Sequence, residues 1–347
     1  VEIVKATYFN PKIVVIDETT TALSQEGREE LYKHMERIRK SGNTVIFISH
    51  DLPEIIEKSD TITILRDGVY IDTVKSKDVN ENDLKKLMVG REVTGDYYRS
   101  DYGEKVSDEV VLSVKDVTVP GLIENVSFDL HKGEILGFGG LSESGMHEIG
   151  KAIFGASYDR EGTVELADGT QINDIPTAIK HSIAYTSKDR DNESVVLNQS
   201  IGDNICLPSL DELSGPAHLI SDKKKKDFAN KFAKQMSVKM VDVNQFVSNL
   251  SGGNKQKVVL ARWIGKDSDI VVLDSPTRGI DIKVKQDIYQ LMNQMRKNGK
   301  SIIMISEELM ELIGMCDRIM IMKDGKISGE LERDQNLDEN GLITMMV

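Results

Sequence analysis

The stretch that decides the fold is Leu250-Ser251-Gly252-Gly253-Asn254-Lys255-Gln256-Lys257. Two glycines follow a serine, and the apolar residues after them recur with helical spacing. Glycine lets a backbone approach a ligand closely, and the first turn of a helix presents N–H groups and a positive dipole end to an anion. Because the stretch lacks the lysine of a phosphate-cradling loop, it predicts a helix start that contacts a phosphate group from outside.

Two short apolar stretches, each ending in an acidic residue, are further evidence for the fold. Residues 269–274 end in Asp274, and residues 11–17 end in Asp17, which Glu18 follows. Continuous apolar runs of this length are typical of strands in a parallel sheet that is covered on both faces. Because such strands alternate with helical patterns along the chain, the sequence predicts an α/β fold with a mainly parallel sheet.

The chain repeats itself without a gap across residues 1–88. Asp17 and Asp274 lie 257 residues apart (274 − 17 = 257), and the same offset relates Ser49 to Ser306. We therefore expect two homologous units: residues 1–94, a polar linker at 95–109, and residues 110–347. Val1 corresponds to Val258, just beyond the glycine stretch, so the first unit is expected to be the C-terminal part of a longer unit, without its own phosphate loop and glycine stretch.

Composition excludes several classes of protein. The formal net charge of −13 over 347 residues argues against general affinity for nucleic acid. No apolar run nears the ~18 residues that a membrane-spanning helix needs. Cys206 and Cys316 are far apart and lack the spacing of metal ligands, so they are expected to be reduced thiols.

The first unit carries a set of residues suited to the hydrolysis of a nucleotide. That reaction needs an acid for magnesium, a base that orients water, and a group that senses the γ-phosphate. Asp17 is the candidate magnesium ligand, Glu18 the candidate base, and His50, at the end of the next strand, the candidate γ-phosphate contact.

The second unit departs from this set at each point. Its Gly-x4-Gly loop supplies candidate phosphate contacts at Gly140, Ser142, Ser144 and Gly145, with Asp274 as the candidate metal ligand. Four positions are degenerate: Met146 stands for the loop lysine, His147 for a magnesium-binding hydroxyl residue, Ser275 for the base and Glu307 for the histidine.

Losing a positioned base alone costs roughly 10²–10⁴-fold in rate. The carboxylate of Glu307 would also repel a γ-phosphate. The second pocket is therefore expected to be non-hydrolytic. Two interpretations stay open: the loop binds phosphate weakly through its backbone amides, or it is retained for packing alone.

The glycine stretch closely resembles the signature motif of ATP-binding-cassette (ABC) proteins, which contacts the γ-phosphate of ATP held by another cassette. Two further stretches, Asp274-Ser275-Pro276-Thr277-Arg278-Gly279-Ile280-Asp281 and Ile305-Ser306-Glu307-Glu308-Leu309, are similar to the second cassette of sugar importers. Lys188-Asp189-Arg190 resembles the Glu-Asp-Arg element of these proteins, with lysine in place of glutamate. Together they indicate the tandem-cassette ATP-binding subunits of the ribose and galactose type.

This resemblance implies a P-loop NTPase-like fold, ATP and Mg²⁺ as cofactors, and ATP hydrolysis coupled to transport. It also implies a membrane-embedded sugar permease and an extracytoplasmic sugar-binding protein as partners, a peripheral location at the cytoplasmic face of the membrane, and no nucleic-acid partner. The working site would combine acids of the first unit with the second unit's signature, namely Ser251, Gly252, Gly253 and Gln256. Ser24 and Asp281 would lie in loops at the cassette interface.

Two other functions remain possible on the sequence. A soluble tandem-cassette protein that acts on ribosomes normally keeps the base in both cassettes and has a long charged linker, which Ser275 and the short segment 95–109 do not match. A binding or regulatory module without turnover is the other alternative. The chain by itself, with neither a lysine-bearing phosphate loop nor a first signature, is expected to have negligible ATPase activity.

Overall fold

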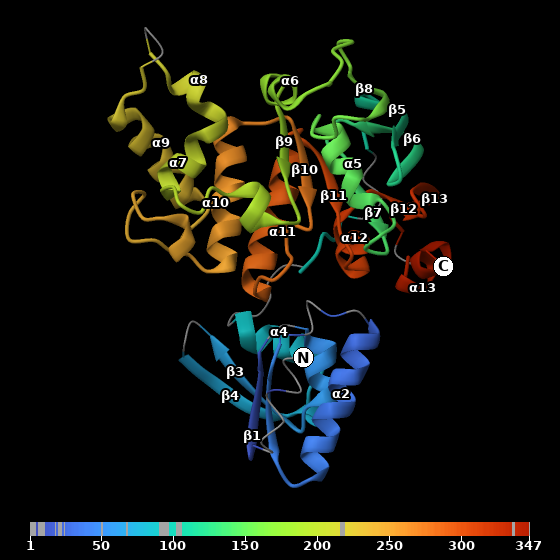
Figure 1. Ribbon diagram of the computed structural model, residues 1–347, viewed down its shortest axis with the longest axis vertical. Helices are drawn as coiled ribbons and strands as arrows, with labels where there is room; N and C mark the ends of the chain where they lie inside the picture. Colours follow the sequence, from blue (N-terminus) through green and yellow to red (C-terminus); the bar gives the residue numbers. More distant parts are fainter. Residues whose placement is uncertain are drawn as a thin grey trace. The chain divides into compact units, whose positions relative to one another are not determined.

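The computed structural model describes residues 5, 11–17, 19, 23, 25–49, 51–66, 69–89, 97–101, 106–215, 219–334 and 337–346. The chain divides into two compact units (Figure 1). The first comprises residues 1–96 with 279–285, and the second comprises residues 97–278 with 286–347.

A six-stranded sheet forms the centre of the second unit, with the order β13-β12-β7-β11-β10-β9. Its strands are β7 (Ile135–Gly140), β9 (Ile183–Thr186), β10 (Ile270–Asp274), β11 (Ser301–Ile305), β12 (Arg318–Lys323) and β13 (Lys326–Glu332). All pairings are parallel except that of β12 with β13. Every residue of β10 and β11 is buried, as expected for apolar strands covered on both faces. The α/β class with a mainly parallel sheet is as predicted.

A second sheet has three antiparallel strands in the order β6-β5-β8. These strands are β5 (Val110–Val119), β6 (Ile123–His131) and β8 (Glu161–Leu166). From Val126 onward the apolar residues of β6 alternate with polar ones, so one face of the strand is buried and the other faces solvent.

Helices cover the sheets and form a separate group at one side (Figure 1). The helices after residue 106 are α5 (Met146–Ile153), α6 (Ile175–Lys180), α7 (Ile201–Cys206), α8 (Leu210–Leu213), α9 (Asp222–Gln235), α10 (Gly252–Lys266), α11 (Ile282–Lys297), α12 (Leu309–Met315) and α13 (Glu339–Met346). Helices α7, α8 and α9 make up the group beside α10.

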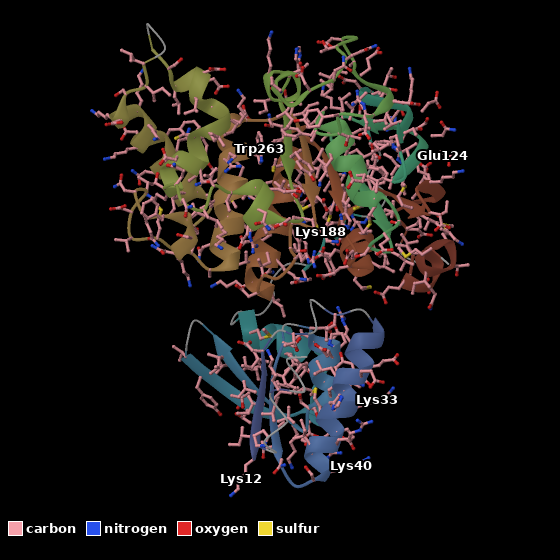
Figure 2. All side chains as sticks on the ribbon, viewed as in Figure 1. Lys12, Lys33, Lys40, Glu124, Lys188 and Trp263 are labelled. Carbon is pink, nitrogen blue, oxygen red and sulfur yellow. The ribbon has the colours of Figure 1, made fainter. Side chains whose placement is uncertain are left out.

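Two buried side chains fix α10. Arg262 donates hydrogen bonds to the carbonyls of Asn204 in α7 (2.7 Å) and Ser194 (2.6 Å), and burial lowers its pKa to about 10. Trp263, labelled in Figure 2, packs edge-on against Phe154 with ring centroids 5.9 Å apart. The helix that begins with the glycine stretch is therefore held on both sides by buried contacts.

The first unit repeats the order of elements found in the C-terminal part of the second unit. Its elements are β1 (Ile13–Asp17), α2 (Gln25–Lys40), β2 (Thr44–Ile48), α3 (Leu52–Lys58), β3 (Thr61–Arg66), β4 (Val69–Lys75) and α4 (Glu81–Val89). Adding 257 to the bounds of the first six gives the bounds of β10, α11, β11, α12, β12 and β13. The parallel register also agrees, because Ile13 pairs with Thr44 where Ile270 pairs with Ser301.

The two units differ in what covers the sheet. Val15 and Ile48 of the first unit are 59% and 45% exposed. Their counterparts Val272 and Ile305 are fully buried and lie against Gly150 of α5. The first unit thus presents to solvent an apolar face that α5 covers in the second unit.

Both units also contain the same buried carboxylate arrangement. Glu311 of α12 accepts hydrogen bonds from the hydroxyls of Thr277, Tyr289 and Ser306. Glu54, its counterpart in α3, accepts hydrogen bonds from Tyr32 and, at 2.7 Å, from Ser49. Each carboxylate therefore binds the serine that directly follows β2 or β11.

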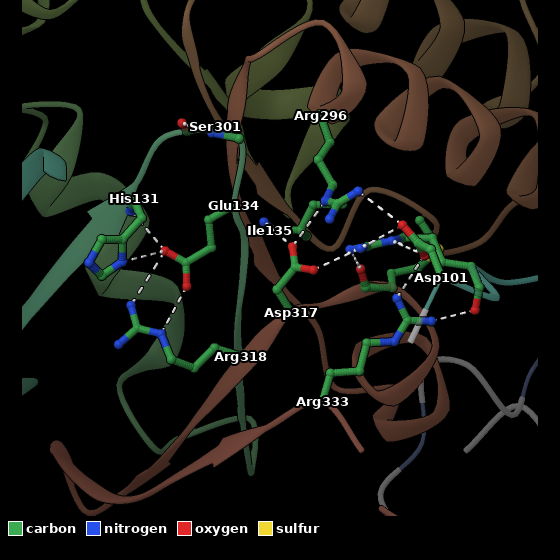
Figure 3. Close-up of polar contacts among 12 residues, drawn as sticks. Asp101, His131, Glu134, Ile135, Arg296, Ser301, Asp317, Arg318 and Arg333 are labelled. Carbon is green, nitrogen blue, oxygen red and sulfur yellow. Dashed lines mark hydrogen bonds and ion pairs between the residues drawn. The ribbon is translucent and has the colours of Figure 1, made fainter. Parts of the chain in front are cut away.

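Part of the predicted linker is packed tightly into the second unit (Figure 3). Arg99 is almost fully buried, and its guanidinium binds Asp101 (2.9 Å), Asp317 (2.7 Å) and the carbonyl of Met315 (2.8 Å). Arg296 and Arg333 bind Asp101 from other elements, at 2.9 and 3.2 Å. The segment 97–101 is thus part of the fold of the second unit.

Other expectations from the sequence can be compared directly. Cys206 and Cys316 are both free and buried, and burial raises the pKa of the Cys206 thiol to about 11. Among the described residues, no helix has the length and apolar character needed to cross a lipid bilayer.

We expect Asp101→Asn to destabilise the second unit by about 1–3 kcal/mol, because the change removes an anion that Arg99, Arg296 and Arg333 share. Burial raises the pKa of Asp101, but its hydrogen bond to Arg99 outweighs this and lowers the pKa to about 2. The stabilisation is therefore present above pH 3.8, the ordinary pKa of an aspartate, and is lost as the pH falls toward 2.

Urea unfolding followed by Trp263 fluorescence measures this difference. Asp108→Asn, at an exposed position of the same segment, is the matched control and should leave the midpoint unchanged. Equal midpoints for the wild type and Asp101→Asn would show that the network contributes nothing to stability.

Candidate functional site

A glycine-bounded loop joins β7 to α5 at the carboxyl end of the sheet. A Cβ atom on Gly140 would lie 2.7 Å from the carbonyl oxygen of Met322, and one on Gly145 would lie 2.5 Å from that of Leu122. Gly145 also has a φ of +90°, which favours glycine. Both positions therefore require glycine, and the predicted Gly140, Ser142, Ser144 and Gly145 share one compact loop at the start of a helix.

Four elements bring polar side chains to the mouth of this loop. Ser142 comes from the loop, His147 from the first turn of α5, Lys188 from the segment after β9, and Glu307 from the segment after β11. Lys188 is labelled in Figure 2. The same oxygen, Oε1 of Glu307, lies 2.5 Å from Ser142 Oγ, 2.6 Å from Lys188 Nζ and 3.4 Å from His147 Nε2. The site is thus centred on a carboxylate with several donors.

Charge pairing shifts the pKa values of this cluster. Donors to Glu307, first His147 and then Lys188 and Ser142, outweigh burial and hold the pKa of Glu307 far below its usual range. Burial lowers the pKa of His147, but hydrogen bonds to Asp274 and Glu307 raise it above its ordinary value overall. The cluster therefore balances its charges internally.

Asp274, the predicted magnesium ligand of this unit, is already engaged. It is buried at the end of β10, and its Oδ1 atom lies 2.7 Å from His147 Nδ1. Mg²⁺ requires oxygen ligands in near-octahedral geometry, and an imidazole stands where a hydroxyl ligand is needed. No group of three or more candidate metal ligands occurs within the part of the chain that the structure describes. The residues of this pocket do not fit Mg²⁺.

The other two degenerate positions are Met146 and Ser275. Met146 is fully buried at the start of α5, so its side chain belongs to the core. Ser275 follows Asp274 with a φ of +50°, and its N–H donates to the carbonyl of Ile305 at 2.8 Å. Neither residue supplies a charge to the pocket.

The signature stretch forms the predicted helix start. Ser251 precedes the first turn of α10, which Gly252 and Gly253 open, and Gln256 is buried. The Oγ atom of Ser251 accepts a hydrogen bond from Asn254 at 3.0 Å. Lys255 binds Asp191 at 2.9 Å, so the segment that carries Lys188 also contacts the signature helix. The contact of this helix start with phosphate stays a prediction.

Several predicted residues lie in or near the first unit. Asp17 ends β1 and is exposed, unlike its buried counterpart Asp274. Asp281 accepts a hydrogen bond from the N–H of Val284 at 3.0 Å and caps α11. Glu18, His50 and Ser24 lie outside the described residues.

Sequence reasoning did not place Lys188 in the pocket. In the sequence, Lys188 stands out only as a substitution within a three-residue element. However, β9 pairs in parallel with β10, so the residues that follow both strands emerge at the same sheet edge. The parallel pairing seen in the structure therefore accounts for this contact. Tyr185, within β9, also reaches the site, and its hydroxyl lies 3.5 Å from Asp274.

Comparisons with known proteins identify this architecture. The family model described as "ABC transporter" matches residues 123–278. The dimeric ABC transporter cassette MJ0796 is similar to 64% of the chain and 99% of its own length, with a TM-score of 0.57 and 22% identity. A nucleotide-free ATP-binding cassette from an ABC transporter covers 69% of the chain, with a TM-score of 0.58 and 18% identity. The fold and the loop thus define an ABC nucleotide-binding cassette.

Curated relatives extend the match over nearly the whole chain. The ribose import ATP-binding protein of Clostridium tetani is 38% identical over 98% of the chain and 67% of its own length. The xylose import ATP-binding protein of Thermoanaerobacter pseudethanolicus is 43% identical over 96% of the chain and 68% of its own length. The chain therefore belongs to the ABC transporter family of ATP-binding proteins, whose members are ATPases.

We expect the ATP turnover of the Ser275→Glu variant to lie within about twofold of that of Ser275→Gln, its uncharged control. Catalytic groups that act as a unit are not additive, so restoring one of them alone gives little gain. The new carboxylate would face a pocket without a metal site or a loop lysine. Phosphate release measures the turnover. A clear gain specific to glutamate would show that the missing base is the pocket's sole defect.

Proposed function

We propose that this chain acts in the ATP-hydrolysing subunit of a simple-sugar importer. In this proposal it lies at the cytoplasmic face of the membrane and energises a membrane-embedded permease, to which an extracytoplasmic sugar-binding protein delivers the sugar. Relatives named for ribose and xylose import, 38–43% identical over most of the chain, support this assignment.

We further propose that the protein is a tandem cassette. The support is the repeated set of elements at an offset of 257 residues, with the same strand register and the same buried glutamate. The apolar face around Val15 and Ile48 adds to it, because the phosphate-loop helix covers the equivalent face in the second unit.

Hydrolysis is assigned to the first repeat. Asp17 would hold Mg²⁺, which supplies charge compensation for the phosphates when bound. Glu18 would orient water and accept its proton, and His50 would contact the γ-phosphate. Ser251, Gly252 and Gly253 of the second repeat would supply the signature contacts in the assembled importer.

One observation supports the proposal that the first repeat hydrolyses ATP while the second supplies the signature. The second repeat keeps an ordered signature helix, whereas its own pocket pairs Asp274 with His147 and Glu307 with Lys188. A cassette with this combination is suited to complete another site and not to hydrolyse ATP itself. The ribosome-acting alternative lacks support of this kind, since no curated relative described above is named for it.

We expect Glu18→Gln to reduce sugar uptake by the assembled importer roughly 10²–10⁴-fold, because it removes the positioned base but keeps the shape of the side chain. Ser275→Ala, at the equivalent position of the second repeat, is the matched control and should change uptake by less than about twofold.

Uptake of labelled ribose and xylose by cells, with ATP hydrolysis by the purified importer as a second readout, measures both effects. Equal losses from the two variants would contradict the assignment of hydrolysis to the first repeat. Full uptake with Glu18→Gln would contradict the role of Glu18.

A further inference from the structure

The phosphate loop of the second unit keeps the features of an anion-binding loop. Its two glycines are sterically required, and it opens a helix of eight residues. The Oγ atom of Ser144 is buried and has no hydrogen-bond partner among the residues that the structure describes. A buried hydroxyl without a partner is costly, and a phosphate oxygen bound in the loop would satisfy it.

The outer end of the same site is already filled by a negative charge. Glu307 Oε1 receives hydrogen bonds from Ser142 of the loop and from Lys188, at 2.5 and 2.6 Å. A hydroxyl of the loop and a lysine are the kinds of donor that bind the terminal phosphate of a nucleoside triphosphate. In this unit those two donors are bound to the carboxylate of Glu307 instead.

The position at which a metal ion would bind is also occupied, by the side chain of His147. His147 lies 2.7 Å from the Asp274 oxygen on which magnesium would depend, and its other ring nitrogen lies 3.0 Å from Lys188 Nζ. A triphosphate that entered would compete with the Glu307 carboxylate for Ser142 and Lys188, without a metal ion to screen the repulsion between the two anions. A nucleoside diphosphate lacks the third phosphate group and therefore does not meet the Glu307 carboxylate.

The geometry points to a nucleoside diphosphate site in the second unit, in which Glu307 excludes a third phosphate and binding needs no Mg²⁺. This inference rests on the proposed function only in treating the pocket as a cassette nucleotide site. Of the two interpretations left open by the sequence, this inference adopts phosphate binding.

Equilibrium titration of the chain with fluorescent ADP and fluorescent ATP, each with EDTA and with MgCl₂, tests the inference. We expect ADP to bind at least about tenfold more tightly than ATP, because only the triphosphate meets the like charge. Added Mg²⁺ should change the ADP affinity by less than about twofold, because Asp274 is occupied by His147.

The decisive variant is Glu307→Gln, which keeps the size of the side chain and removes its charge. ATP affinity should rise about tenfold while ADP affinity changes by less than about twofold, so the preference for ADP disappears. Glu308→Gln, at the exposed neighbouring position, is the matched control and should keep the wild-type preference. Circular dichroism and Trp263 fluorescence check that each variant is folded.

Four results would overturn the inference: no binding of either nucleotide, equal or tighter binding of ATP by the wild type, a marked gain in affinity with Mg²⁺, or an unchanged preference in Glu307→Gln. Each is distinct from a failure of the proposed function, because transport is measured through Glu18 and this preference through Glu307. Normal transport without a diphosphate preference would remove this inference alone.

Discussion

The parallel pairing of β7, β9, β10 and β11 is the constraint on which the second unit depends. Because neighbouring parallel strands end at the same edge of a sheet, this pairing delivers the phosphate loop, Lys188, Asp274 and Glu307 to one place although they are up to 167 residues apart (307 − 140 = 167). The hydrogen-bonded register fixes their spacing before any side chain is chosen. Chemistry at this edge can therefore change through single substitutions while the fold remains.

The two repeats show what such substitutions leave untouched. Glu54 and Glu311 both bind the serine that follows the second strand of each parallel pair, together with a tyrosine from the preceding helix. The arrangement holds the strand end whether histidine or glutamate follows it in the sequence. The buried carboxylate thus belongs to the scaffold, whereas the residue that follows the serine differs between the two repeats.

Local patterns were sufficient to predict most of the fold. Two glycines before a helical periodicity placed the start of α10, and apolar runs closed by acids placed β1 and β10. The substitutions at Met146, His147, Ser275 and Glu307 were also visible in the sequence. The contact of Lys188 with Glu307 was not, because it depends on side-chain reach across the sheet edge. The burial of Arg99 was not, because its partner Asp317 lies more than two hundred residues away and the surrounding stretch shows no periodicity.

Trp263 gives the molecule a built-in optical label. It is the single tryptophan of the chain, it is almost fully buried, and it sits in the helix that the signature opens, against the ring of Phe154. Emission excited selectively from indole therefore originates in the second unit, while the first unit is silent. A change at the signature helix is thus open to spectroscopy without attaching a dye.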